Sequence, residues 1–222
     1  MKEHTNITLT DEMQQKLDFY CKFLREENEK YNLTAITDEH DIRVKHFADS
    51  ILGSVAIPCN AAVCDVGSGA GFPALPLAIV RSDISVTLVD SLEKRINFTK
   101  TLCHQININA EFFHERAEDF AKSHSEAYDV ATARAVAPLN ILLEYTAQII
   151  KVGGIVVAYK TDLSELDGAA NACRLLNLQF ETHHDFVLPD GSSRSILVFR
   201  KIAPTPSKYP RGQNKPRKSP LF

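Results

Sequence analysis

Residues 62–77 read Ala-Val-Cys-Asp-Val-Gly-Ser-Gly-Ala-Gly-Phe-Pro-Ala-Leu-Pro-Leu, and this stretch predicts the fold. Its first part is a short apolar run that ends at Val66, which is typical of a buried parallel strand. Three glycines follow at alternate positions, Gly67, Gly69 and Gly71, and two prolines then stand where the first turn of a helix would lie. Glycine lets the backbone approach a ligand closely, and a helix N-terminus offers unpaired N–H groups. A strand, a glycine turn and a helix in this order therefore predict a cradle for a nucleotide-like ligand.

An acidic residue downstream strengthens this prediction. Residues 85–90 read as a second strand that ends in Asp90, 23 residues after Gly67. At about that interval, nucleotide-binding α/β folds place a carboxylate on ribose hydroxyls. An ordinary strand-to-helix turn with a surface aspartate is the alternative, and the two features together at this spacing argue against it.

Length and composition allow one α/β core with a small appendage, since the chain has 222 residues, of which 44% are hydrophobic. No apolar run approaches the roughly 18–20 residues that cross a membrane, and residues 1–6 contain no signal-peptide core. We therefore expect a cytoplasmic protein without membrane contact. Five single cysteines with no CxxC pair indicate neither a metal site nor a disulfide framework.

Helices and strands alternate after residue 58, which predicts a doubly wound α/β sheet closed by an antiparallel hairpin. Three regions are expected: an N-terminal helical extension (1–58), a central domain (59–200) and a flexible tail (201–222). The extension contains helical patterns at about 10–30 and 38–55, and a further helix is expected at about 162–176. The tail is rich in proline and has no periodicity, so it is expected to form no core.

Several polar residues stand where strands of the predicted sheet end. Arg134 closes the fourth strand and Lys160 the fifth, and an arginine buried at such a position needs a carboxylate or a ligand. Ala117 and Glu118 follow the third strand, where they either reach a nucleobase or cap a surface helix. Lys45 and His46 lie on the second helix of the extension, either on a solvated face or beside the ligand cleft.

Charge is unevenly distributed along the chain. Residues 201–222 carry six basic residues and no acid, so a tail of +6 follows a body of −9. Such a tail suggests a polyanionic partner. The tail residues expected to contact it are Lys208, Arg211, Lys215, Arg217 and Lys218.

Two ligand classes suit the cradle, namely nicotinamide or flavin dinucleotides and S-adenosylmethionine. Phe72 stands where the final glycine of GxGxxG would be, and that glycine allows close helix–strand packing in dinucleotide folds. Its absence favours S-adenosylmethionine. A dinucleotide-dependent oxidoreductase and a non-catalytic RNA-binding module remain as alternatives.

Motifs spread over nearly the whole chain carry a resemblance to a known family. They are Tyr31–Thr34 (YNLT), Lys45–Ser50 (KHFADS), Asp65–Pro76 (DVGSGAGFPALP), Val89–Arg95 (VDSLEKR), Arg116–Glu118 (RAE), Ala133–Ala135 (ARA) and Thr205–Arg211 (TPSKYPR). With these the chain resembles the GidB family, also called RsmG, of bacterial methyltransferases that modify N7 of a guanine in 16S ribosomal RNA. It departs from the family pattern at Ala74, at Ala133 and at Tyr159–Thr161, and the last two departures lie near the expected substrate edge.

The resemblance implies a class I, Rossmann-like methyltransferase with S-adenosylmethionine as cofactor, no metal, and 16S ribosomal RNA or the small ribosomal subunit as partner. It implies cofactor contacts at Gly67, Phe72, Asp90, Ser91, Leu92, Ala117, Glu118 and Arg134, beside the cradle glycines Gly69 and Gly71. Arg134 and Lys160 are expected to position substrate or cofactor, and Lys45, His46 and the basic tail to bind RNA. We expect a monomer and no general base, because N7 of guanine already carries a free lone pair.

Overall fold

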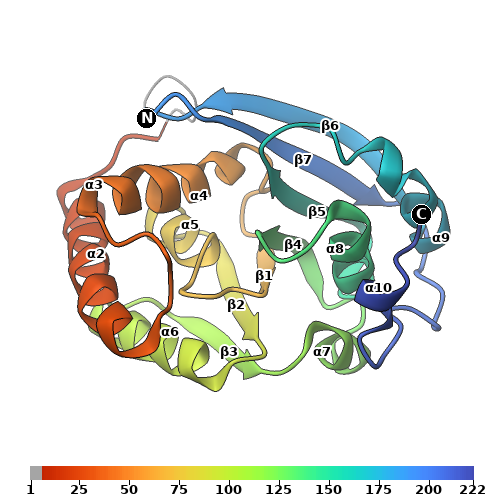
Figure 1. Cartoon of the computed structure of the whole chain (residues 1–222), viewed down its shortest axis with the longest axis horizontal. Helices are drawn as coiled ribbons and strands as arrows, with labels where there is room; N and C mark the ends of the chain where they lie inside the picture. The colour runs from red at the N-terminus through yellow and green to blue at the C-terminus, as the bar shows by residue number, and fades with distance from the viewer. Residues whose placement is uncertain (1–6) are drawn as a thin grey trace.

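The computed structural model describes residues 7–222, which form a seven-stranded sheet covered on both faces by helices (Figure 1). The strands lie in the order β3-β2-β1-β4-β5-β7-β6. Their bounds are β1 (Ala62–Val66), β2 (Ser85–Asp90), β3 (Ala110–His114), β4 (Tyr128–Arg134), β5 (Ile150–Lys160), β6 (Leu178–Val187) and β7 (Ser193–Lys201). Strands β1 to β5 pair in parallel, and β7 pairs antiparallel with both β5 and β6. The expected doubly wound sheet with a final hairpin is confirmed.

The order of the strands positions the ligand site. β1 pairs with β2 on one side and with β4 on the other, so the chain reverses its direction of winding at β1. In open α/β sheets, ligands bind beyond the carboxyl ends of the strands at such a switch point. The glycine turn after β1, Asp90 at the end of β2 and Arg134 at the end of β4 therefore meet at one edge of the sheet.

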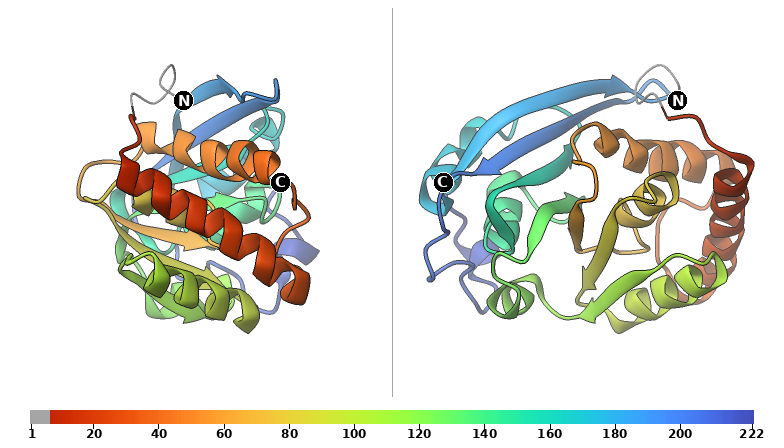
Figure 2. Two further views of the ribbon diagram at one scale, coloured as in Figure 1. Left: turned by 90° about the vertical axis from the view of Figure 1, so that its left-hand side faces the viewer. Right: turned by 180° about the vertical axis from the view of Figure 1, so that it is seen from behind.

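Helices cover the two faces of the sheet and form two apolar cores. On one face lie α5 (Ala74–Val80), α6 (Glu93–Gln105) and the N-terminal helices. On the other lie α7 (Ala117–Ser123), α8 (Leu139–Thr146) and α9 (Ala170–Leu176), which follows the short η3 (Asp167–Ala169). Figure 2 shows both layers from two further directions, with β6 and β7 as a long curved hairpin along one border. No helix among residues 7–222 has the length and apolar character that crossing a membrane requires.

The N-terminal helices are α2 (Asp11–Tyr31), α3 (Glu39–Asp41), the π-helical η1 (Ile42–Ala48), α4 (Asp49–Leu52) and η2 (Gly53–Val55). Thr10 caps α2, because its side chain accepts a hydrogen bond from the Met13 amide. Leu17, Tyr20 and Leu24 recur at helical spacing, and all three are buried in the core. The Tyr20 hydroxyl donates to the Ala70 carbonyl in the glycine turn. The extension thus packs directly against the predicted ligand cradle.

The C-terminal tail, residues 201–222, is packed against the body, which corrects the expectation of a flexible segment. The Arg211 guanidinium donates two hydrogen bonds to the fully buried carboxylate of Glu144 on α8, at 2.8 and 2.7 Å, and the Arg211 amide donates a third at 2.9 Å. Tyr209, Pro216 and Leu221 are buried. The tail contains the short helix α10 (Lys215–Lys218), which lies beside α8. A composition rich in proline and lysine does not reveal such anchoring, because it depends on a carboxylate 67 residues away.

The helix expected at about 162–176 is shorter than predicted. Asp162 accepts a hydrogen bond from the Ser164 amide at 2.8 Å, and this local side-chain bond competes with helical geometry. Glu165 turns back to accept from the Lys160 ammonium group and the Leu139 amide. Regular α-helix therefore begins only at Ala170.

Candidate functional site

The glycine turn after β1 is tied to the end of β2. The amides of Gly67 and Ser68 both donate to the Val89 carbonyl, at 2.8 and 3.1 Å. Gly67 and Gly69 have φ angles of +72° and +58°, which side chains other than glycine rarely adopt. A Cβ at Gly67 would lie 2.7 Å from the Val136 side chain, whereas one at Gly69 would meet no atom within 4 Å. The turn is therefore closed on one side, at Val136, and open on the other.

Asp90 connects this turn with the start of α6. Its carboxylate accepts hydrogen bonds from the amides of Gly69 and Leu92, both at 2.9 Å, and pairs with Arg95 at 3.3 Å. A carboxylate has about four acceptor positions, so these three contacts leave roughly one free. Asp90 is buried, yet it lines the pocket described next. The remaining acceptor position is available to a ligand hydroxyl.

A pocket opens at the carboxyl ends of β1, β2 and β4, and we call it the acidic pocket. Its wall contains five of the residues expected to bind the cofactor, Gly67, Asp90, Ser91, Ala117 and Glu118. Residues to which no cofactor contact was assigned also line it, among them Arg95 and Tyr145. The sequence thus predicted about a third of the residues that line this wall.

Two polar groups test whether S-adenosylmethionine suits the acidic pocket. Glu118 has only 5% of its surface exposed and lines the pocket, and no hydrogen bond among residues 7–222 involves its carboxylate, whose oxygens are not fully buried. The Nε atom of Arg95 is buried without a partner among the described residues. A buried donor of this kind requires a hydrogen-bonding partner. A ligand that offers an amino group and hydroxyl groups, as adenosine does, satisfies this need, so the pocket fits the cofactor.

The other residues expected at the cofactor lie outside the wall of the acidic pocket. The Phe72 ring is buried and stacks on His46 and Tyr20, with centroids 4.3 and 5.3 Å apart. Gly71 follows the open part of the turn, and Leu92 is 43% exposed at the start of α6. Phe72 therefore connects the cradle with the N-terminal extension through its side chain.

A second pocket lies beside the first, at the carboxyl ends of β4 and β5, and we call it the basic pocket. The side chains that define it are Lys45, His46, Asp49, Arg134, Lys160 and Arg194. Ala135, which has a φ of +56°, lines both pockets. The structure thus brings the predicted Arg134, Lys160, Lys45 and His46 together, next to the acidic pocket rather than inside it.

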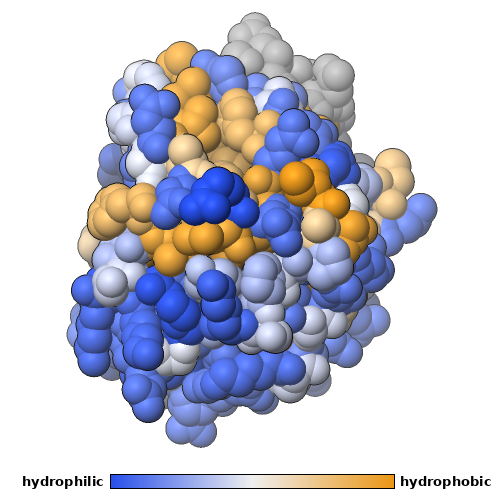
Figure 3. All heavy atoms as spheres, turned by 90° about the vertical axis from the view of Figure 1, so that its right-hand side faces the viewer, coloured by the Kyte–Doolittle hydropathy of each residue, from blue (hydrophilic) through white to orange (hydrophobic). Residues whose placement is uncertain are grey.

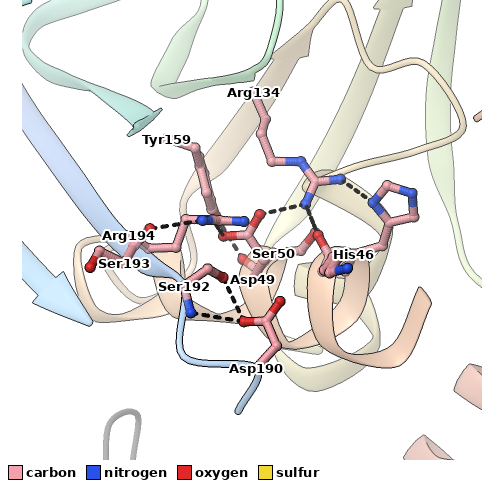
Figure 4. A network of polar contacts seen from close by, with 10 residues as sticks. His46, Asp49, Ser50, Arg134, Tyr159, Asp190, Ser192, Ser193 and Arg194 are labelled. Carbon is pink, nitrogen blue, oxygen red and sulfur yellow. Dashed lines mark hydrogen bonds and ion pairs between the residues drawn. The ribbon is translucent and has the colours of Figure 1, made fainter. Parts of the chain in front are cut away.

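The centre of the basic pocket is a buried carboxylate between two guanidinium groups (Figure 4). Asp49 has only 4% of its surface exposed and accepts from Arg134 Nη1 at 2.8 Å and from Arg194 Nε at 3.0 Å. Arg134 also donates to the Lys45 carbonyl at 3.1 Å. The carboxylate partner expected for an arginine at the end of β4 is therefore present, and it comes from α4. Two guanidinium groups against one carboxylate leave this centre with a net positive charge.

His46 is held in its neutral form. Burial and then the charge of Arg134 lower the pKa of His46 from 6.5 to about 3. Its Nδ1 atom accepts from Arg134 Nη2 at 3.0 Å, so the proton lies on Nε2, which donates to the Thr34 hydroxyl at 2.9 Å. His46 consequently brings no positive charge to an RNA surface, so its expected contact with RNA would have to be uncharged.

The remaining polar groups of the basic pocket are also engaged. The Lys160 ammonium group lies 2.9 Å from both carboxylate oxygens of Glu165 and 3.2 Å from the Ala137 carbonyl. The buried Tyr159 hydroxyl donates to the Ser50 carbonyl at 2.7 Å. Lys45 pairs with Asp41 at 2.9 Å and stays partly exposed at the rim.

The basic residues of the tail divide into two groups. Lys208, Lys215 and Lys218 are exposed, and no ion pair among residues 7–222 involves them. Arg211 is occupied by Glu144 and by the Ser219 carbonyl, so its guanidinium group has little charge to offer to a phosphate. Arg217 is turned towards the acidic pocket.

Sequence reasoning missed Arg194 and the part that the tail plays at the acidic pocket. Arg194 follows the turn between β6 and β7 and reaches a carboxylate 145 residues earlier in the chain. The sequence offers two weak signals, namely an arginine in the predicted final hairpin and the basic tail itself. Neither signal specifies a partner.

Among residues 7–222, no cluster of three His, Cys, Asp or Glu side chains is arranged to hold a metal ion. The sheet order, the glycine turn and the acidic pocket together define a Rossmann-like methyltransferase. Solved structures agree with this fold. The chain matches M. jannaschii TYW2 in complex with AdoMet with a TM-score of 0.57 and 12% identity, covering 71% of this chain and 76% of that one. It matches a ribosomal protein L11 methylase from Lactobacillus delbrueckii subsp. bulgaricus with a TM-score of 0.55 and 18% identity, covering 71% and 79%.

Sequence comparison is more specific. Residues 13–193 match the family model of GidB, described as rRNA small subunit methyltransferase G. The chain is 45% identical over 229 aligned positions to ribosomal RNA small subunit methyltransferase G of Staphylococcus aureus (strain JH9), covering 100% of this chain and 95% of that protein. The same identity and coverage hold for the relative from strain Newman. The chain belongs to the GidB family of small-subunit ribosomal RNA methyltransferases.

This membership confirms the expected family, the methyltransferase activity on small-subunit ribosomal RNA, and S-adenosylmethionine as methyl donor. It removes the dinucleotide-dependent oxidoreductase and the non-catalytic RNA-binding module as alternatives.

Proposed function

We propose that the protein transfers a methyl group from S-adenosylmethionine to N7 of a guanine in 16S ribosomal RNA, with the acceptor base in the basic pocket. The observation that carries this proposal is the engagement of every carboxylate and imidazole in that pocket. Asp49 is bound by two arginines, Glu165 by Lys160, and His46 by Arg134 and Thr34. No such group lining the pocket is free to take up a proton. A ring nitrogen with a lone pair suits this pocket, because it needs no deprotonation before it attacks.

In the acidic pocket, the free acceptor position of Asp90 would take the ribose hydroxyls. The Ala117 backbone and the Glu118 carboxylate would form hydrogen bonds with the edge of the adenine. The turn at Gly67 would enclose the methionine part of the cofactor. The cofactor supplies a methyl group that its sulfonium already activates. The contribution of the chain is therefore placement, and a well-oriented pair of reactants gains ~7–11 kcal/mol over a bimolecular encounter.

Ala135 lies between the two pockets, and a base in the basic pocket would meet the methyl donor beside it. Arg134 and Lys160 would position that base and its phosphate. Guanine presents O6 next to N7, and arginine or lysine is the usual donor to that oxygen. Arg194 would help to position the base, because it is held beside Arg134 by the same carboxylate, Asp49.

Lys45 at the rim and the exposed Lys208, Lys215 and Lys218 would contact phosphates and fix the orientation of the RNA. We further propose that the protein works as a monomer in the cytoplasm and acts on the small ribosomal subunit or its RNA. Sedimentation and fractionation of cells test the first two points. A comparison of free 16S RNA with intact subunits as substrates tests the third.

The decisive experiment is transfer of a tritiated methyl group to 16S RNA from cells that lack an enzyme of this family. The expected product is a single labelled guanine at which borohydride followed by aniline cleaves the RNA, since this treatment cleaves at N7-methylguanosine. Label on an exocyclic amine or on ribose would refute the proposed acceptor atom.

The cofactor assignment is tested separately by titration calorimetry on Asp90→Ala. Its affinity for S-adenosylmethionine should fall at least tenfold, because about 1.5–3 kcal/mol is lost with a hydrogen bond to a charged group. Glu93→Ala is a suitable control, since it removes an exposed carboxylate that lies outside the pocket wall. An affinity of Asp90→Ala within a factor of two of the wild type would remove Asp90 from the ribose site.

A further inference from the structure

The C-terminal tail contributes part of the wall of the acidic pocket. Asn214 and Arg217 line it together with Gly67, Asp90 and Glu118. The Arg217 guanidinium donates to the Val136 carbonyl at 2.8 Å and also contacts the Tyr145 hydroxyl. Val136 is the residue against which the Gly67 turn is packed. Arg217 is therefore fixed from two sides at the edge of the cavity.

The tail is held in this position by buried contacts on both sides of Arg217. Earlier in the sequence, the Arg211 guanidinium donates two hydrogen bonds to the buried carboxylate of Glu144. After Arg217, the buried Leu221 accepts a hydrogen bond from the Asn140 side chain through its carbonyl, at 3.3 Å. Figure 3 shows the face on which the chain ends, with hydrophobic side chains across its middle and mainly hydrophilic ones below. The segment that reaches the pocket is thus a built part of the fold.

The tail approaches the pocket from the side of Glu118. Asn214 has a left-handed backbone with a φ of +59°, and it lines a neighbouring depression together with Arg116, Glu118 and Lys215. Glu118 is the nearly buried carboxylate without a hydrogen-bond donor among residues 7–222. The tail residues therefore stand next to the group proposed to take the adenine edge.

We propose that the C-terminal segment is part of the cofactor site and that Arg217 and Asn214 contact the adenosine end of S-adenosylmethionine. This rests on the proposed placement of adenosine at Ala117 and Glu118. A planar guanidinium group packs well on an aromatic face, and an asparagine amide offers both a donor and an acceptor to the edge of a base. Arg217 is then a cofactor-binding residue rather than a phosphate contact.

Docking of the tail and binding of the cofactor are therefore coupled. A ligand that touches the docked tail stabilises it by as much as the docked tail strengthens binding of the ligand. Removing the tail should therefore weaken binding of the cofactor.

The test is titration calorimetry on the full-length Arg217→Ala variant with two ligands, S-adenosylmethionine and 5′-methylthioadenosine, which lacks the amino-acid part. We expect both affinities to fall by a similar factor, about fivefold to thirtyfold. Lys218→Ala is the matched control, because it removes the same charge one residue along without touching the pocket, and it should stay within twofold. No loss in Arg217→Ala, or a loss with S-adenosylmethionine alone, would overturn the adenosine contact.

A second measurement is independent of the substitution. Backbone amides of residues 208–221 should exchange hydrogen more slowly in the wild-type protein once 5′-methylthioadenosine is added, and unchanged exchange would overturn the coupling. If Arg217→Ala unfolds at a lower temperature, Arg217→Lys replaces it, since lysine keeps the charge and loses the planar group. These readouts concern binding, so a failure to methylate 16S RNA would count against the proposed function and leave this inference standing.

Discussion

Asp65, the acid that precedes the glycine turn on β1, allows a quantitative test of burial beneath the ligand site. It is fully buried, and its carboxyl group accepts a hydrogen bond from the Thr132 hydroxyl at 2.9 Å. Burial raises the pKa of Asp65 from 3.8 to about 7, against the opposing effect of that hydrogen bond. Since one pKa unit corresponds to 1.36 kcal/mol, keeping Asp65 protonated while the unfolded chain ionises costs about 4 kcal/mol.

The sign follows from the two pKa values. Below pH 3.8 Asp65 is protonated in both states and costs nothing. As pH rises towards 7, only the unfolded state releases its proton, so the folded state progressively loses stability. Asp65→Asn cannot ionise, and its side chain can still accept from Thr132. The stability of the variant relative to the wild type should therefore increase between pH 4 and 7, by up to about 4 kcal/mol.

Urea unfolding followed by circular dichroism at several pH values and constant ionic strength measures this difference. Asp83→Asn is the control with the opposite sign, because the Arg81 side chain and the Asn60 amide lower the pKa of Asp83. The stability that Asp83 contributes is fully present above pH 3.8 and is lost only as pH falls below that value. A difference between Asp65→Asn and wild type that stays constant from pH 4 to 7 would show that Asp65 ionises normally, and the reasoning from burial would fail.

Three further substitutions probe the basic pocket. Neutral His46 resists protonation only in the folded state, so the wild type loses stability when the pH falls from 6.5 to 4. His46→Gln should lose about 3 kcal/mol less than the wild type over this range. Equal pH dependence of the two proteins in urea unfolding would contradict this. Asp49→Asn leaves Arg134 without a counter-charge and should cost about 3–5 kcal/mol, so an unchanged melting temperature would refute the network. Gly53→Ala places a Cβ 1.9 Å from the Tyr159 hydroxyl and should destabilise the protein by ~1–3 kcal/mol. Adding Tyr159→Phe should recover much of that loss, and purely additive effects would show that the hydroxyl is not the obstacle.

The features predicted correctly from the sequence are those encoded over short distances. The glycine turn, Asp90 and the ends of the parallel strands follow from local patterns, and strand alternation places them at one edge. The helix after Lys160 was predicted too long because Asp162 and Glu165 form local bonds that no apolar periodicity reveals. The motif that contains Phe72 does not reveal that its ring stacks on Tyr20 and His46 of the N-terminal extension.

The unpredicted features depend on pairs of residues far apart in the chain. Arg194 pairs with Asp49, 145 residues earlier in the sequence, and Arg211 pairs with Glu144, 67 residues earlier. In both pairs the acid is buried in a helix, where its sequence context resembles that of any solvent-facing acid. A proline-rich basic segment is typical of disorder, and only a matching buried carboxylate makes this one part of the fold.

Each end of the chain contributes wall residues to one of the two pockets at the edge of the central sheet. The N-terminal extension supplies Asp49 and His46 to the basic pocket and fixes the glycine turn through Tyr20, while the tail supplies Asn214 and Arg217 to the acidic pocket. Because the two pockets share Ala135, a shift of either end would change the distance between a methyl donor and an acceptor base bound as proposed. The proposed reaction, which has no general base, would depend on this alignment, because placement is then the main contribution of the chain.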